Sequence, residues 1–231
     1  GSLITNFLCG YGYTENSEEA IAARESGKAL AAQVEEGGAV LMKNENNVLP
    51  LKNKKVNVFG WGGSDDGFMP QGTGSGTGSR NELVTFLGGL KEAGIEYNTM
   101  LADAYDDLNW NRVGTSGNYV IEAHGEAYKD IYGVSEAPES FYTDTLMSNA
   151  INYSDTAIIV LGRLMGEGND FAKTQYFSNQ AGGGEDATRK LQSLSAREEY
   201  MIDLVSANFE NVIIVTNTGN PIELGIADDS K

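Results

Sequence analysis

The sequence contains little that could bind a metal ion, form a disulfide or cross a membrane. Its 231 residues include one cysteine, Cys9, and one histidine, His124. An internal disulfide and a metal cluster built from cysteine or histidine ligands are therefore excluded. No run of about 18 apolar residues occurs, so no membrane-spanning helix is predicted. No metal ion and no organic cofactor is predicted from any spacing of residues.

Basic residues are also scarce. The chain has 16 lysines and arginines against 33 aspartates and glutamates, and its formal net charge is −17. A surface this acidic repels phosphate backbones and anionic headgroups, which argues against binding to nucleic acid or to a membrane surface. The hydrophobic content of 40% is ordinary for a globular protein, so extensive disorder is not expected.

The apolar pattern predicts an α/β protein with a mostly parallel sheet. Short runs rich in β-branched residues are typical of buried strands, and helical spacing of apolar residues predicts the helices between them. The expected strands are residues 55–60, 95–101, 155–162 and 211–217. The expected helices are residues 18–36, residues 81–93 and a segment opened by a capping box at Ser195 and Glu198. Strands alternating with helices predict βαβ units in one layered domain.

The domain organisation is expected to be simple. Residues 1–231 are predicted to form one domain, with residues 1–17 as a lead-in. Residues 103–147 are polar and lack clear periodicity, which indicates an inserted helical or loop region. The chain opens on Gly-Ser-Leu without an initiator methionine, so we expect it to be a piece of a longer protein.

The glycine-rich segment from Gly60 to Ser79 is a candidate ligand loop. It contains no lysine, so it cannot be a phosphate-binding Walker loop, and Thr77 occupies the third glycine position of the dinucleotide fingerprint. Asp65 and Asp66 would repel phosphates. The segment is therefore interpreted as a loop in close approach to a ligand, or as a plain connection between elements.

The segment after the strand at 155–162 holds the best candidate for acid/base chemistry. Glu167 stands between Gly166 and Gly168, which leaves its carboxyl group free of neighbouring side chains. Desolvation beside a bound ligand would raise its pKa, as a catalytic acid requires. Arg163 and Asp170 are candidates to orient this carboxyl group or to bind substrate hydroxyl groups. The alternative is that Glu167 is one acidic residue of many on a solvated loop.

Other residues carry weaker signals. His124 has no nucleophile or metal partner in its sequence pattern, and it is interpreted as a surface or packing residue. Cys9 is interpreted as a packing residue or as part of a poorly ordered chain end. Several aromatic residues stand in or near the expected loops and could stack on sugars, although burial in the inserted region is the commoner outcome. They are Trp61, Phe68, Tyr105, Trp110, Tyr119 and Tyr142.

Four segments together resemble the α/β-sandwich domain of glycoside hydrolase family 3. Residues 34–51, Val-Glu-Glu-Gly-Gly-Ala-Val-Leu-Met-Lys-Asn-Glu-Asn-Asn-Val-Leu-Pro-Leu, are similar to the family's entry into that domain. Residues 56–60 followed by Gly-Ser-Gly at 74–76 resemble its next strand and loop. The strand at 155–160 followed by Gly-Glu-Gly-Asn-Asp at 166–170 resembles a segment of its β-glucosidases, and residues 211–221 resemble a further strand ending in Gly-x-Pro.

The resemblance implies a three-layer α/β/α sandwich and a retaining, exo-acting hydrolase of β-linked sugars. In the family, a nucleophilic Asp comes from a (β/α)8 barrel and the general acid/base, a Glu, comes from the sandwich. Matching the motif residue by residue assigns the acid/base role to Glu167 and aligns Asp170 with the family's Asp. Phe171 stands where many members have Arg, which changes the surroundings expected for that Asp.

The same resemblance implies a missing partner domain. A (β/α)8 barrel takes about 250 residues by itself, so the chain is expected to lack the nucleophile and to be inactive alone. The lead-in at residues 12–17 is similar to members in which the barrel follows the sandwich, and the sandwich itself is expected to continue beyond Lys231. Glucosides, xylosides and other β-glycosides remain open as substrates. The alternatives are a non-catalytic sugar-binding or interaction domain and, more weakly, a flavodoxin-like nucleotide domain.

Overall fold

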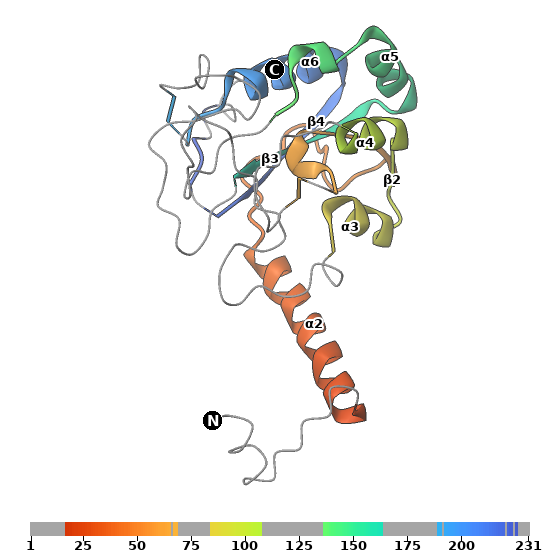
Figure 1. Ribbon diagram of the computed structural model, residues 1–231, viewed down its shortest axis with the longest axis vertical. Coiled ribbons are helices and arrows are strands. Elements are labelled where there is room, and N and C mark those ends of the chain that lie inside the picture. Colours follow the sequence, from red (N-terminus) through yellow and green to blue (C-terminus); the bar gives the residue numbers. More distant parts are fainter. Residues whose placement is uncertain are drawn as a thin grey trace. The chain divides into compact units, whose positions relative to one another are not determined.

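A computed structural model of the chain describes residues 17–65, 67–68, 84–107, 136–163, 189–190, 192–219, 221–223 and 225. Figure 1 shows the helices and strands and labels them where there is room. They are α2 (Glu18–Gly38), β1 (Lys55–Phe59), η1 (Trp61–Gly63), α3 (Phe86–Glu92), β2 (Glu96–Tyr97), α4 (Thr99–Asp106), η3 (Glu139–Phe141), α5 (Asp144–Tyr153), β3 (Thr156–Arg163), α6 (Ala196–Asn208) and β4 (Asn211–Thr218). The chain divides into two compact units between Glu45 and Asn46. The single domain over residues 1–231 stays a prediction.

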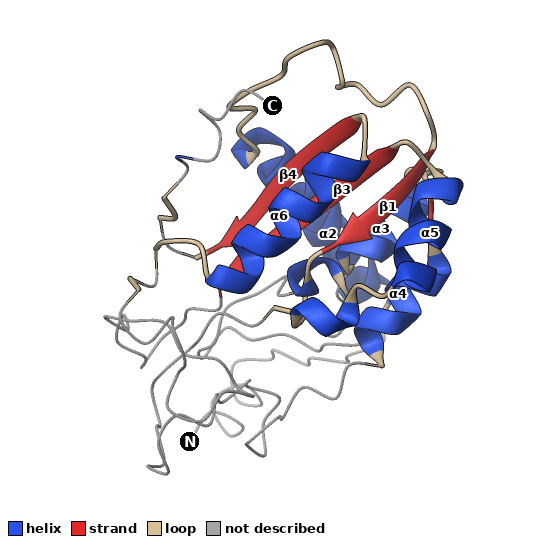
Figure 2. Ribbon diagram, turned by 90° about the horizontal axis from the view of Figure 1, so that it is seen from above, coloured by secondary structure: helices blue, strands red, loops and turns tan. Residues whose placement is uncertain are grey.

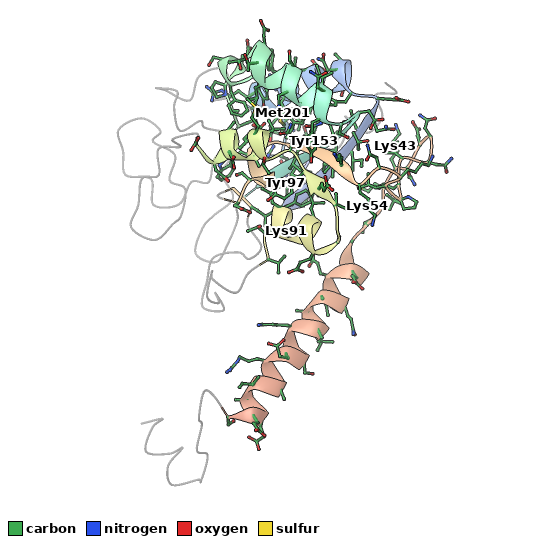
Figure 3. The ribbon with its side chains drawn as sticks, turned by 90° about the vertical axis from the view of Figure 1, so that its right-hand side faces the viewer. Lys43, Lys54, Lys91, Tyr97, Tyr153 and Met201 are labelled. Atoms are coloured by element: carbon green, nitrogen blue, oxygen red, sulfur yellow. The ribbon has the colours of Figure 1, made fainter. Side chains whose placement is uncertain are left out.

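The first unit contains helix α2, which confirms the helix predicted over residues 18–36. The Ser17 hydroxyl oxygen caps the helix by accepting a hydrogen bond from the Ala20 N–H at 3.1 Å. Glu18 and Glu19 in the first turn complement the positive end of the helix dipole. No residue of α2 is buried, and the side chains along the helix are drawn in Figure 3.

The second unit is built on a four-stranded parallel sheet in the order β2-β1-β3-β4. Figure 2 shows β1, β3 and β4 side by side. Val58 lies opposite Ile158, and Ile158 in turn lies opposite Ile213. This sheet confirms the α/β class and the parallel arrangement predicted from the sequence.

Helices cover both faces of the sheet, which gives the three layers that were predicted (Figure 2). Alternate residues of a strand point to opposite faces, so Ile159 and Leu161 pack with α4, α5 and α6, whereas Ile158 and Val160 pack with Leu87 of α3. The buried core on the α4, α5 and α6 side includes Phe59, Leu101, Tyr105, Leu146, Met147, Ala150, Met201, Ile202, Val205 and Phe209.

The strand predicted over residues 95–101 is wrong in its second half. Only Glu96 and Tyr97 pair with β1, and a helix, α4, begins at Thr99. The cause is Asn98, whose side-chain oxygen accepts a hydrogen bond from the Leu101 N–H at 3.3 Å and so caps the new helix.

Gly94 ends the preceding helix, α3, at a φ of +70°, as its place in the sequence predicted. In the described part of the chain, no helix combines the length and the hydrophobicity needed to span a membrane.

A buried asparagine joins β1 to the helices that cover it. Asn57 is fully buried, and its amide group donates to the carbonyl oxygens of Ala150 and Ser154 at 3.0 and 3.1 Å. Its side-chain oxygen accepts from Asn98 at 2.9 Å. These bonds satisfy the polar side chain inside the core and link β1 to both ends of the α4–α5 region.

Candidate functional site

The strand order determines where a ligand site is expected. The chain leaves β1 through α3 to β2 on one side, whereas β3 lies on the other side of β1. In open parallel sheets, ligands bind outside the carboxyl ends of the strands at such a reversal of direction. The candidate site is therefore expected at this edge of the sheet, beside Gly60, which follows β1, and Arg163, the last residue of β3.

Backbone segments meet closely at this edge of the sheet. Gly60 has a φ of +91°, and a Cβ atom there would lie 2.5 Å from the Val160 carbonyl oxygen. A Cβ atom on Gly62 would lie 2.9 Å from the Gly162 nitrogen. The first glycines of the Gly60–Ser79 segment are therefore needed for contact with the backbone of β3. Residues 69–79 of this segment lie outside the described residues.

A buried carboxyl group, Glu136, holds the start of the same segment. One of its oxygens accepts from the Trp61 N–H at 3.0 Å, and the other accepts from the Ala137 N–H at 2.8 Å and lies 3.5 Å from the Tyr142 hydroxyl group. Glu136 is 2% exposed, and burial raises its pKa from 4.5 to about 8, with the Glu198 carboxylate adding to the increase. The carboxyl group is therefore neutral in the folded protein near pH 7.

Two tyrosines continue this buried polar cluster. The Tyr105 hydroxyl oxygen accepts from the Gly60 N–H at 2.9 Å and lies 3.0 Å from the Tyr142 hydroxyl oxygen. The Tyr105 hydroxyl also lies 3.7 Å from the sulfur of Met201, which is labelled in Figure 3. Burial raises the pKa of both tyrosines well above the usual value. Their hydroxyl groups are neutral hydrogen-bonding groups that fix the backbone directly after β1.

A buried ion pair lies at the end of β3. Arg163 donates two hydrogen bonds to the two carboxylate oxygens of Glu198, at 2.6 and 2.9 Å. The Arg163 side chain is 0% exposed and that of Glu198 is 2% exposed. Arg163 also donates to the carbonyl oxygens of Gly162 and Ser193 at 2.8 and 3.0 Å. Glu198 completes the predicted capping box by accepting from the Ser195 N–H at 2.9 Å.

The predicted site residues divide between described and undescribed parts of the chain. Arg163 lies at the end of β3 with its guanidinium group buried against Glu198, and its predicted role in substrate binding stays a prediction. Glu167 and Asp170 lie outside the described residues, as do Cys9, Trp110, Tyr119 and His124. Among the other aromatic candidates, Trp61, Tyr105 and Tyr142 are buried.

The sequence did not point to Glu136, nor to the pairing of Glu198 with Arg163. The capping-box pattern predicted the local bonds of Glu198, but its ionic partner stands 35 residues earlier in the chain. Glu136 bonds to a backbone group 75 residues away, and its own surroundings in the sequence are polar and without periodicity. In the described ranges, no group of three His, Cys, Asp or Glu side chains is arranged to hold a metal ion.

Comparison with known families relates the chain to carbohydrate enzymes. The profile of the "Glycosyl hydrolase family 3 C-terminal domain" matches residues 39–231. The chain belongs to this family. The matched range includes both segments at the carboxyl ends of β1 and β3, and so takes in Arg163, Glu167 and Asp170. The resemblance seen in the sequence motifs is confirmed.

Relatives of this glycosyl hydrolase family 3 domain include named β-glucosidases. The chain is 34% identical over 203 residues to "Beta-glucosidase" of Ruminococcus albus, covering 86% of this chain and 18% of the relative. It is 27% identical over 222 residues to "Beta-glucosidase A" of Butyrivibrio fibrisolvens, covering 90% of this chain and 24% of the relative. The chain thus spans 18–24% of the length of these relatives.

Solved structures agree with the family assignment. β-Glucosidase 3B from Thermotoga neapolitana, in complex with α-D-glucose, is 25% identical with a TM-score of 0.68, over 97% of this chain and 28% of that one. A β-glucosidase from Paenibacillus barengoltzii is 27% identical with a TM-score of 0.58, over 82% of this chain and 18% of that one.

Proposed function

We propose that this chain is the acid/base-bearing domain of a retaining, exo-acting β-glycosidase of the β-glucosidase type, with Glu167 as the general acid/base. The observation that carries the proposal is the strand order. Arg163, the last residue of β3, lies at the reversal between β1 and β3, and Glu167 is four positions later in the sequence. This is the edge of the sheet at which parallel α/β proteins bind ligands. The family match and the named β-glucosidase relatives support the same activity.

The proposed chemistry needs two carboxyl groups about 5–5.5 Å apart. An aspartate attacks the anomeric carbon while Glu167 donates its proton to the leaving oxygen, so the glycosidic bond breaks and a glycosyl–aspartate ester forms. Glu167, now ionised, then removes a proton from water, which attacks the anomeric carbon and releases the sugar and the aspartate. Asp170 is proposed to accept hydrogen bonds from sugar hydroxyl groups.

The nucleophile is proposed to come from a (β/α)8 barrel elsewhere in the full-length protein. Such a barrel takes about 250 residues, and the relatives are several times longer than this chain, which spans 18–24% of them. From the lead-in at residues 12–17 we propose that the barrel follows this domain. The barrel and a β-linked glycoside are the two partners that this function requires.

The Glu167→Gln variant of the full-length protein tests the acid/base role. A glutamine cannot donate a proton to the leaving oxygen, so kcat/KM for an alkyl β-glucoside, whose leaving group is poor, is expected to fall about 10²–10⁴-fold. For 2,4-dinitrophenyl β-glucoside, whose leaving group needs little protonation, the rate of the first step should fall about tenfold or less. Pre-steady-state and steady-state release of the alcohol or phenol measures both effects.

The Glu185→Gln variant is the matched control, because it removes one acidic residue from the same stretch of sequence and is expected to retain activity on both substrates. Equal losses in the rate of the first step on the two substrates in Glu167→Gln would contradict an acid role. Unchanged turnover on both would remove the enzyme proposal and favour a non-catalytic sugar-binding or interaction domain.

The 231-residue chain by itself is expected to release no aryl alcohol from 2,4-dinitrophenyl β-glucoside above the uncatalysed rate. The physical reason is that an acid without a nucleophile cannot form the covalent intermediate, even with an activated leaving group. Measurement at high protein concentration, with the full-length protein as the positive control, checks this. Turnover by the isolated chain that is abolished in its Glu167→Gln variant would show that the nucleophile lies within these 231 residues.

A further inference from the structure

We propose that the buried pair of Arg163 and Glu198 is a positioning device, which fixes the carboxyl end of β3 against helix α6 and thereby sets where the acid-bearing segment starts. The inference rests on the proposed role of Glu167. It assigns a function to Glu198. In this proposal Arg163 positions the segment that carries Glu167 and does not itself contact the sugar.

The geometry of the pair is unusually restrictive. The guanidinium group and the carboxylate form two parallel hydrogen bonds, at 2.6 and 2.9 Å, and both side chains are closed to solvent. A bidentate pair of this kind fixes orientation as well as distance. Arg163 also donates hydrogen bonds to the carbonyl oxygens of Gly162 and Ser193, at 2.8 and 3.0 Å, and these bonds fix the plane of its guanidinium group.

The pair connects two rigid elements. Arg163 lies opposite Thr218 in the ladder between β3 and β4, so its backbone is part of the sheet. Glu198 is locked into the first turn of α6 by the capping box, in which Ser195 Oγ accepts from the Glu198 N–H at 3.1 Å. Met201, one turn further along α6, is fully buried in the core. The end of β3 is therefore tied to a helix that is itself fixed at both its cap and its apolar face.

The position of the pair relates it to catalysis. Glu167 is four positions after Arg163 in the sequence, so their Cα atoms can be at most about 14 Å apart. Any shift or rotation of the last residue of β3 is passed directly to the start of this short segment. A displacement of about 1 Å at a reacting group can lower a rate about 10²-fold.

Stability alone does not account for the pair. Removing two charges from water is costly, and replacing a buried ion pair with apolar residues of similar volume is often neutral or stabilising. The bidentate pair supplies a defined direction for the end of a strand, which apolar side chains of similar volume do not.

The test compares the Arg163→Met/Glu198→Leu double variant of the full-length protein with the wild type. Neither charge is left unpaired in the double variant, but Glu198→Leu also removes the capping-box bond from the Ser195 N–H. The double variant is therefore expected to unfold a few degrees below the wild-type midpoint. Its KM for the alkyl β-glucoside should stay within about threefold of wild type, whereas its kcat should fall at least about tenfold. The rate of its first step on 2,4-dinitrophenyl β-glucoside should fall less, because that step depends less on the acid when the leaving group is activated.

The Arg163→Lys variant makes the same test if the double variant does not fold. Lysine keeps the charge but loses the bidentate fork, so kcat for the poor leaving group should fall while KM is retained. The matched control is Arg189→Gln/Glu199→Gln, which removes a 2.8 Å ion pair at the start of the same helix whose side chains are 30% and 49% exposed. This control is expected to keep wild-type kcat and KM.

Two outcomes would overturn the inference. Wild-type kcat in a folded double variant would mean that the pair has no positioning role. A KM more than about tenfold higher in the Arg163 variants, together with unchanged KM in Glu198→Leu, would mean that Arg163 contacts the substrate. Failure of the proposed function is distinct, because it is read from Glu167→Gln: a selective loss there combined with a fully active double variant would remove only the positioning role.

Discussion

The Gly60→Ala variant is expected to lose about 4 kcal/mol or more of its free energy of unfolding. Two effects add. Gly60 has a φ of +91° and a ψ of 132°, a backbone conformation that residues with a Cβ atom rarely adopt. The new Cβ atom would also lie 2.5 Å from the Val160 carbonyl oxygen, and this contact involves backbone on both sides. Relief therefore requires β1 and β3 to move apart, which would break the hydrogen bond from the Gly60 N–H to the Tyr105 hydroxyl oxygen.

Gly94→Ala is the matched control for this prediction. Gly94 has a φ of +70°, but a Cβ atom there meets nothing within 4 Å. Its substitution should cost about 1–2 kcal/mol, the conformational part alone. Urea denaturation of the 231-residue chain, with a check that the m-value is unchanged, measures both variants. If Gly60→Ala cost no more than Gly94→Ala, the close approach between the ends of β1 and β3 would be wrong.

The second large effect is a dependence of stability on pH that comes from Glu136. Burial raises the pKa of this carboxyl group to about 8, whereas in the unfolded chain it has its ordinary value near 4.5. Between these two values the folded protein holds one more proton than the unfolded chain. The contribution of Glu136 to stability is therefore fully present below pH 4.5, falls as the pH rises, and levels off above pH 8. The change from pH 5 to pH 8 is expected to be roughly 3–4 kcal/mol.

The Glu136→Gln variant isolates this contribution. Glutamine does not titrate, so the slope that Glu136 supplies between pH 5 and pH 8 should disappear. The amide nitrogen cannot accept a hydrogen bond, however, so one of the bonds from the Trp61 and Ala137 N–H groups is lost. We therefore expect the variant to be less stable than wild type at pH 5 and to approach or exceed it at pH 8.

Chemical denaturation at several pH values measures the two curves. Glu139→Gln serves as the control, because it removes an exposed carboxyl group three residues further along the chain and leaves Glu136 and its slope in place. Parallel curves for wild type and Glu136→Gln would contradict the raised pKa.

The elements that the sequence predicted well are those defined by local signals. The apolar run from Thr156 to Leu161 produced β3, and the Ser195–Glu198 capping box opened α6 where expected, because caps and strand patterns depend on residues that are close in the chain. The strand expected over 95–101 was too long because a single helix cap, Asn98, overrode an apolar and β-branched run. Both outcomes depend on side chains within four residues of each other.

The buried polar groups could not be predicted, because their partners come together only in the folded sheet. Tyr105 meets Gly60 and Tyr142 across 45 and 37 residues, and the polar stretch that contains these tyrosines was interpreted as a loop or helical insertion. Arg163 was chosen as a ligand for substrate hydroxyl groups because it follows a strand, and the sequence held no sign of its burial against Glu198. The acid/base prediction for Glu167 came from motif resemblance. The fold supports it through the position of β3, which ends four residues before Glu167 at the reversal of the sheet.

The parallel pairing of β1 with β3 also has a consequence for how the chain folds. Asn57 lies beside Ala157, about one hundred residues later, so this pairing closes a large loop before it gains any contacts. Proteins rich in such distant contacts fold slowly, whereas a local unit such as β1–α3–β2 can form early. Loop-closure entropy rises only with the logarithm of loop length, by about 0.6 kcal/mol for each doubling. The long separation between β1 and β3 in the chain therefore costs little at equilibrium, and its main expected effect is on the folding rate.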